Sequence, residues 1–124
     1  MKPETALKAA QWWREKIAAG EHHNNGANDM ANELAMMMAD MLAIKNTPSA
    51  DQLSQFEMDL AGELMSLDMN NVSIHCDYHP DPILAKVANK NNISDTVFPY
   101  KTGMTISGDD IEVSEGYGAG YQKI

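Results

Sequence analysis

The spacing of apolar residues first changes at Asn70-Asn71, and this change constrains the fold more than any other feature. Before it, apolar side chains recur every three or four residues, which is the spacing of one face of a helix. After it, apolar residues alternate with polar ones, as they do in a strand: Val72, Ile74, Cys76 and Tyr78. Helices followed by strands are typical of the α+β class.

Three helices are expected before the change. The first covers residues 4–19 and ends at Gly20, and its expected apolar face consists of Ala6, Ala9, Ala10, Trp13 and Ile17. The second runs from about residue 28 to residue 44. The third begins after Ser49, a favourable N-cap, and its apolar positions are Leu53, Phe56, Leu60, Leu64 and Leu67. The short connection between the second and third helices predicts an antiparallel pair.

Residues 72–78 are expected to form a strand. Asp81 and Pro82 supply an N-cap and a first-turn proline for a short helix that ends near Lys90. Alternation returns from Met104 to Val113 on both sides of the turn 107–110, which predicts a hairpin. We therefore predict a single α+β domain over residues 1–124, with three N-terminal helices, one further short helix and a small three-stranded, mostly antiparallel sheet.

Composition excludes several classes of protein. The chain has 124 residues, of which 44% are hydrophobic and 22% charged, which suits one folded domain with a modest core. It contains no apolar run near the roughly 20 residues of a membrane span, and its start does not resemble a secretion signal. With Cys76 as the only cysteine, no internal disulfide is possible, so we expect a reducing cytoplasm.

The negative charge is concentrated in the middle of the chain. The formal net charge is −9, and residues 21–70 contain nine acidic residues against one lysine. Such a block repels nucleic-acid phosphates and attracts basic proteins, although it also simply keeps a small protein in solution. On two amphipathic helices, the acids predicted to bind a partner are Glu33, Asp40, Glu57, Asp59 and Glu63.

A run of polar residues at the predicted strand is the candidate metal site. If the strand continues to residue 79, His75, Asp77 and His79 project from one face. Two imidazoles and a carboxylate suit Zn²⁺, Mn²⁺ or Fe²⁺, with a fourth ligand from His22, His23 or Asp81. The alternative is a solvated polar face in which an aspartate organises a turn.

Other side chains suggest less specific chemistry. Cys76 would point into the core, away from both nearby histidines, so we do not expect it to be a nucleophile. Trp12 lies off the apolar stripe of its helix and, with Lys101, could hold an anionic nucleotide, unless it packs at the rim of the core or in a subunit interface. No helix pattern follows the glycine-rich run 116–121, so we interpret it as a packing segment or an edge contact with a partner.

Four short motifs resemble a family of small, uncharacterised proteins carried by phages and prophages. They are Trp12-Trp13, Asp77-Tyr78-His79-Pro80-Asp81, the stretch Phe98 to Met104, and the stretch Ser114 to Ala119. The resemblance covers the first helix and the last third of the chain, and it brings no catalytic residue. It implies a protein that binds and blocks host machinery, such as restriction or CRISPR systems.

Two hypotheses follow from these observations. The first is a non-enzymatic, anti-CRISPR-like interaction protein, expected to be a cytoplasmic homodimer, that binds a basic surface of a host protein. The second is a metal- or nucleotide-binding protein or a small metal-dependent hydrolase that uses His75, Asp77 and His79. We favour the first because every catalytic signature that we tested lacks a part.

Overall fold

A computed structural model describes residues 1–19, 47–67, 71–116 and 119–124. The second predicted helix, residues 28–44, therefore lies outside the described residues, as do Glu33, Asp40, His22 and His23. None of the described helices is long and apolar enough to cross a membrane.

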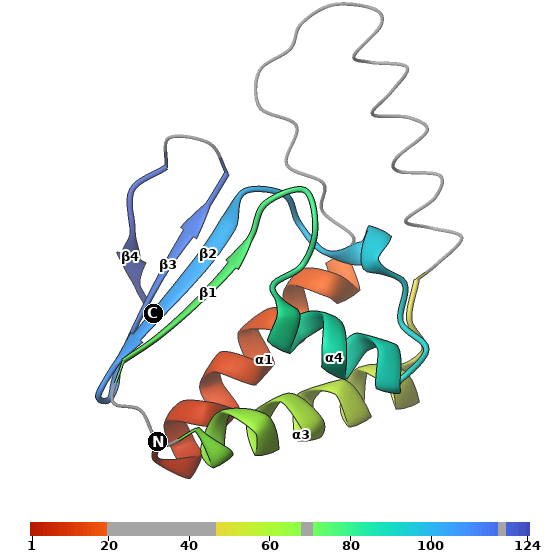
Figure 1. Cartoon of the computed structure of the whole chain (residues 1–124), viewed down its shortest axis with the longest axis horizontal. Helices are drawn as coiled ribbons and strands as arrows, with labels where there is room; N and C mark the ends of the chain where they lie inside the picture. The colour runs from red at the N-terminus through yellow and green to blue at the C-terminus, as the bar shows by residue number, and fades with distance from the viewer. Residues whose placement is uncertain (20–46, 68–70, 117–118) are drawn as a thin grey trace, which may run out of the picture.

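The described chain has an α+β fold with its helices in one layer and its strands in another (Figure 1). The helices are α1 (Pro3–Ala19), α3 (Ala50–Ser66) and α4 (Pro82–Lys90), with a short 3-10 helix at Asp95–Val97. The strands are β1 (Asn71–Cys76), β2 (Thr102–Ser107), β3 (Asp110–Glu115) and β4 (Gln122–Lys123). The predicted fold class is confirmed at this level.

The sheet is antiparallel throughout, with the strand order β1-β2-β3-β4. The predicted hairpin is confirmed: Ser107 lies opposite Asp110, and Gly108 adopts the left-handed φ of 59° that its tight turn requires. The predicted number of strands was wrong, because β4 adds a fourth. This strand has two residues, both exposed, and is too short to produce an alternating pattern.

The predicted strand over residues 72–78 is also too long, because β1 ends at Cys76. The next residues form a local turn in which the Asp77 N–H donates to the His79 carbonyl at 3.2 Å. Tyr78, predicted to alternate inward, is instead 62% exposed. Asp77 and His79 therefore do not continue the face of the strand on which His75 lies.

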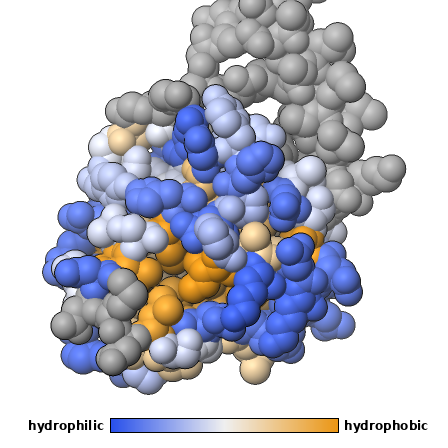
Figure 2. Space-filling view, viewed as in Figure 1, coloured by the Kyte–Doolittle hydropathy of each residue, from blue (hydrophilic) through white to orange (hydrophobic). Residues whose placement is uncertain are grey.

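The core lies between the inner face of the sheet and the helices. The predicted apolar face of α1 is confirmed, with Trp13 at its centre and fully buried. On α3, Phe56, Leu60 and Leu64 are buried, while Leu53 and Leu67 pack at the margin of the core. Figure 2 shows apolar surface between the sheet and the helices, surrounded by hydrophilic residues.

Two predicted helix caps are confirmed. Ser49 accepts a hydrogen bond from the Gln52 N–H of α3 and forms a complete capping box with it. Asp81 accepts from the Ile83 N–H at the start of α4 through one carboxylate oxygen. Its other oxygen accepts from the backbone N–H of His75 at 3.0 Å. Asp81 therefore joins the free edge of β1 to α4 and fixes the position of His75.

Candidate functional site

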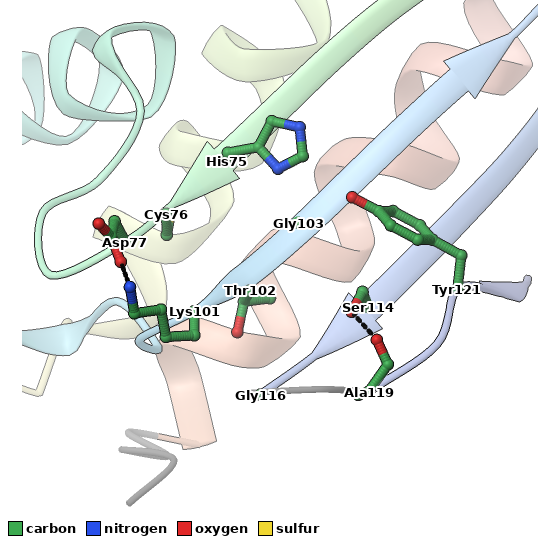
Figure 3. A pocket seen from close by; sticks show the side chains of 10 residues that line it. All are labelled: His75, Cys76, Asp77, Lys101, Thr102, Gly103, Ser114, Gly116, Ala119 and Tyr121. Atoms are coloured by element: carbon green, nitrogen blue, oxygen red, sulfur yellow. Dashed lines mark hydrogen bonds and ion pairs between the residues drawn. The ribbon is translucent and has the colours of Figure 1, made fainter. Parts of the chain in front are cut away.

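A pocket of about 350 Å³ lies on the face of the sheet that points away from the helices (Figure 3). It is found where β1 ends and β2 begins, and Ser114 and Gly116 at the end of β3 and Ala119 and Tyr121 before β4 also line it. Its walls come from His75, Cys76, Asp77, Lys101, Thr102, Gly103, Ser114, Gly116, Ala119 and Tyr121.

Sheet register places three of these residues in one row across the strands. His75 of β1 lies opposite Gly103 of β2, and Gly103 lies opposite Ser114 of β3. Side chains at directly paired positions share a face of the sheet. Tyr121, just before β4, extends its ring over the same row (Figure 3).

Gly103 forms the floor of the pocket because a side chain would not fit there. A Cβ at this position would lie 2.7 Å from the His75 Nδ1 and 3.1 Å from the Tyr121 hydroxyl oxygen. Both distances are shorter than ordinary contacts of a Cβ atom. The glycine therefore serves close approach rather than an unusual backbone angle. It allows the imidazole and the phenol to converge above β2.

The opposite wall is held by an aromatic and ionic cluster. Lys101 forms an ion pair with Asp77, and its Nζ lies 4.6 Å from the ring centroid of Tyr78. The Tyr78 ring in turn meets the Tyr100 ring edge to face, with centroids 5.9 Å apart. The Lys101 N–H donates to the Asp77 carbonyl at 3.1 Å, which secures the cluster through the backbone.

Two side chains of the pocket, the Cys76 thiol and the Ser114 hydroxyl, belong to residue types that can act as nucleophiles, but neither is activated. Burial raises the pKa of the Cys76 thiol to about 11, so it stays protonated at neutral pH. The Ser114 hydroxyl donates its proton to the Ala119 carbonyl at 2.8 Å. Neither group is therefore prepared to act as a nucleophile.

The proposed metal ligands are only partly brought together. His75 and Asp77 both line the pocket, whereas His79 does not. Asp81, a candidate fourth ligand, uses its two oxygens for the backbone N–H groups of His75 and Ile83. Within the described ranges, no three His, Cys, Asp or Glu side chains are placed where they could hold one metal ion.

The two residues predicted to hold a nucleotide occupy different places. Lys101 lines the pocket and Trp12 does not. The Trp12 ring packs edge to face on Trp13 at a centroid distance of 4.9 Å, and the Lys16 Nζ lies 5.2 Å from its centroid. Trp12 therefore lies at the rim of the core, as the alternative interpretation expected.

The acids of the predicted partner-binding face on α3 are paired within the fold. Glu57 pairs with Arg14 of α1 at 3.4 Å, and Glu63 pairs with Lys86 of α4 at 3.0 Å. Asp59 lies 3.6 Å from the Lys90 Nζ. The paired cations lie on α1 and α4. Counting charges along the sequence therefore overestimates the unpaired negative charge on this face of α3.

Asp59 is the most deeply embedded of these acids, and its side chain is 14% exposed. It accepts hydrogen bonds from the Asn91 side-chain amide at 3.0 Å and from the Gln55 amide at 2.9 Å. The bond from Asn91 is the main cause that lowers the pKa of Asp59 below its usual value, while partial burial opposes it. The carboxylate therefore fastens α4 to α3.

Replacing Asp59 with asparagine is expected to lower the free energy of unfolding by about 1–2 kcal/mol at pH 7, because two donors lose a charged acceptor. Since the folded pKa is the lower one, this contribution is present above the pKa of the unfolded chain and disappears as the pH falls through the folded value. The difference between the two proteins should therefore shrink below about pH 4. Urea unfolding of both proteins at several pH values measures this difference in the free energy of unfolding.

The matched control is Glu15→Gln, which removes an exposed carboxylate from α1. We expect this change to alter the free energy of unfolding by less than about 0.5 kcal/mol at every pH. An Asp59→Asn protein that followed the control at pH 7 would contradict the role assigned to Asp59.

Sequence reasoning gave no site role to Gly103 or Ser114, although both lie in the motifs that resemble phage proteins. Tyr121 ends the glycine-rich run 116–121, which was interpreted as a packing segment or an edge contact with a partner. Their common location depends on pairing between strands that are distant in the sequence.

No model of a known protein family matches the sequence, and no curated protein matches it. Function is therefore inferred from the chemistry of the pocket itself.

Proposed function

We propose that this chain is a non-enzymatic binding protein that recognises a protein partner through the pocket above Gly103. One observation carries the proposal: Tyr121 and Tyr78 are 47% and 62% exposed beside a concave site built from distant parts of the chain. Exposed tyrosines next to a pocket are typical anchors of protein interfaces, because the ring supplies contact area and the hydroxyl supplies a hydrogen bond.

The composition of the site supports binding to a protein. Tyrosine, serine and glycine give rigid aromatic contacts together with adaptable hydrogen bonds, as in antibody combining sites. A volume of about 350 Å³ lies at the small end of the roughly 300–1,000 Å³ of typical ligand pockets. It suits one inserted side chain with its flanking backbone. The raised pKa of Cys76 and the committed hydroxyl of Ser114 favour binding over catalysis.

Charge supports a basic partner rather than a nucleic acid. Among the described residues, every lysine and arginine except Lys8 forms an ion pair with an aspartate or a glutamate. Little free positive charge is left for phosphates, and the net charge of −9 attracts basic surfaces. The resemblance to small phage proteins extends the proposal to a protein of the host cell, including a component of its defence systems.

Partner capture tests the proposal. For this experiment an affinity tag is added at the N-terminus, because the backbone N–H of Ile124 at the C-terminus donates a hydrogen bond to the Ile111 carbonyl of β3. Proteins retained from the lysate of a host cell are quantified for the wild type, for Tyr121→Ala and for Leu7→Ala. Leu7 is the matched control, since it is 48% exposed on α1 and does not line the pocket.

We expect a partner that binds the wild type and Leu7→Ala equally and whose recovery falls at least about tenfold with Tyr121→Ala, as for loss of an interface anchor. Equal recovery by all three proteins would mean that the partner binds elsewhere. All three must first show the same unfolding midpoint, so that a difference in capture reports on the surface.

A further inference from the structure

We infer that the group received by the pocket is an arginine side chain of the partner. This inference rests on the proposed function and specifies the chemistry of its contact. Three features support it. Lys101 is paired with Asp77, Glu112 forms no ion pair among the described residues, and the His75 imidazole and the Tyr121 hydroxyl converge above Gly103.

Lys101 does not make the pocket an anion site. Its ammonium group is paired with Asp77 and lies over the Tyr78 ring, and its side chain is only 23% exposed. The Asp77 side chain is 66% exposed, so a carboxylate faces any ligand that approaches this wall. An incoming phosphate or carboxylate would meet that negative charge before it met a free cation.

Glu112 adds negative charge on the same face of the sheet. It precedes Ser114 by two residues on β3, so both side chains point to the outer face. Its cross-strand neighbour Lys123 pairs with Asp110 at 2.9 Å instead. Among the described residues, Glu112 therefore forms no ion pair, although its charge still acts on the Lys123 ammonium group, and it lies two residues along β3 from the pocket-lining Ser114.

The polar tips above Gly103 match a guanidinium group. The His75 imidazole and the Tyr121 hydroxyl lie within 2.7 Å and 3.1 Å of one point and form no hydrogen bond to each other or to another described side chain. A neutral imidazole and a phenol each offer an acceptor. A planar guanidinium can donate to both in one plane while its face stacks on an aromatic ring.

The cluster beside the pocket already contains an interaction of this kind. There, the cation of Lys101 is held by one carboxylate and one tyrosine ring, those of Asp77 and Tyr78. Tyr121 offers an arginine a ring, and Glu112 offers a carboxylate two residues along β3 from the pocket-lining Ser114. A lysine of the partner would fit less well, because its ammonium group lacks the planar fork that can donate to His75 and Tyr121 in one plane while its face stacks on a ring.

The test uses short blocked peptides as probes of the full chain. Acetyl-Gly-Arg-Gly-amide is titrated at pH 8, where imidazole is usually neutral, and compared with peptides that carry citrulline, lysine or glutamate in place of arginine. Citrulline has the shape of arginine without its charge. Binding is measured from NMR shifts of the Tyr121 ring and the His75 imidazole.

We expect saturable shifts with the arginine peptide, at least about tenfold weaker binding of the citrulline peptide, and still weaker binding of the glutamate peptide. Tyr121→Phe, which keeps the ring, should weaken arginine binding a few-fold, and Glu112→Gln should reduce its dependence on salt. Leu7→Ala should bind as the wild type does. These variants change exposed groups, so each is expected to fold.

Equal binding of the arginine and citrulline peptides or stronger binding of the glutamate peptide would overturn the inference. So would the absence of any Tyr121 shift with every peptide at 50 mM, a concentration about fifty times a dissociation constant of about 1 mM. Any of these results combined with loss of partner capture by Tyr121→Ala would show that the pocket binds the partner through another side chain. If Tyr121→Ala also leaves partner capture unchanged, the proposed function itself is wrong.

Discussion

Replacing Trp13 with alanine is expected to lower the free energy of unfolding by about 3–5 kcal/mol, a large part of the total stability of a small domain. Trp13 is fully buried on α1 and is among the largest buried side chains. Its removal would leave a cavity between α1 and the rest of the core and would take away the packing surface of Trp12. Urea unfolding followed by circular dichroism measures the change.

A second variant, Trp13→Phe, separates the contribution of packing from that of the indole N–H. The Trp13 indole N–H is buried and has no hydrogen-bond partner in the described structure. Phenylalanine keeps much of the packing and removes a donor whose burial is costly, so it should cost less than half as much as alanine. Equal costs for the two variants would contradict the conclusion that packing of the indole, rather than its polar atom, stabilises the core.

Replacing Gly103 with alanine is expected to lower the affinity for the partner at least about tenfold. The free energy of unfolding should stay within about 1 kcal/mol of the wild-type value. The new Cβ would lie 2.7 Å from the His75 Nδ1, so the imidazole must move. That ring is the end of an exposed side chain and can rotate outward at little cost. The methyl group would fill the floor of the pocket, and the His75 and Tyr121 side chains would no longer converge above it.

Gly62→Ala is the matched control for this prediction. A Cβ at Gly62, in the interior of α3, would meet nothing within 4 Å. Alanine should stabilise the helix by roughly 0.5–1 kcal/mol and leave partner binding unchanged. If Gly103→Ala retained full binding, close approach of His75 and Tyr121 would be irrelevant to recognition.

Signals confined to a few neighbouring residues predicted much of the fold. The apolar face of α1, the N-cap Ser49 and the Asp81-Pro82 start of α4 all depend on contacts within one or two turns, and each is confirmed. The end of β1 was misplaced because the alternation of residue types continues to His79, while a turn stabilised by the Asp77 backbone ends the strand.

The candidate site could be predicted only in part, because it is assembled by contacts between distant segments. His75, Asp77 and Lys101 were singled out for their chemistry, but nothing near Gly103 in the sequence indicates that His75 and Tyr121 meet above it. The acids of α3 were overvalued for the same reason. Arg14, Lys86 and Lys90, which pair with them, lie on other helices.

Photo-crosslinking tests most directly which surface meets the partner. A benzophenone side chain is placed at position 121 in one protein and at position 58 in another, and both are irradiated in the lysate of a host cell. Met58 is 64% exposed on α3, between the acidic residues Glu57 and Asp59. We predict a crosslinked partner from position 121 and none from position 58. Crosslinking from position 58 alone would contradict the assignment of the pocket as the recognition site. It would indicate that the partner binds the acidic face of α3 instead.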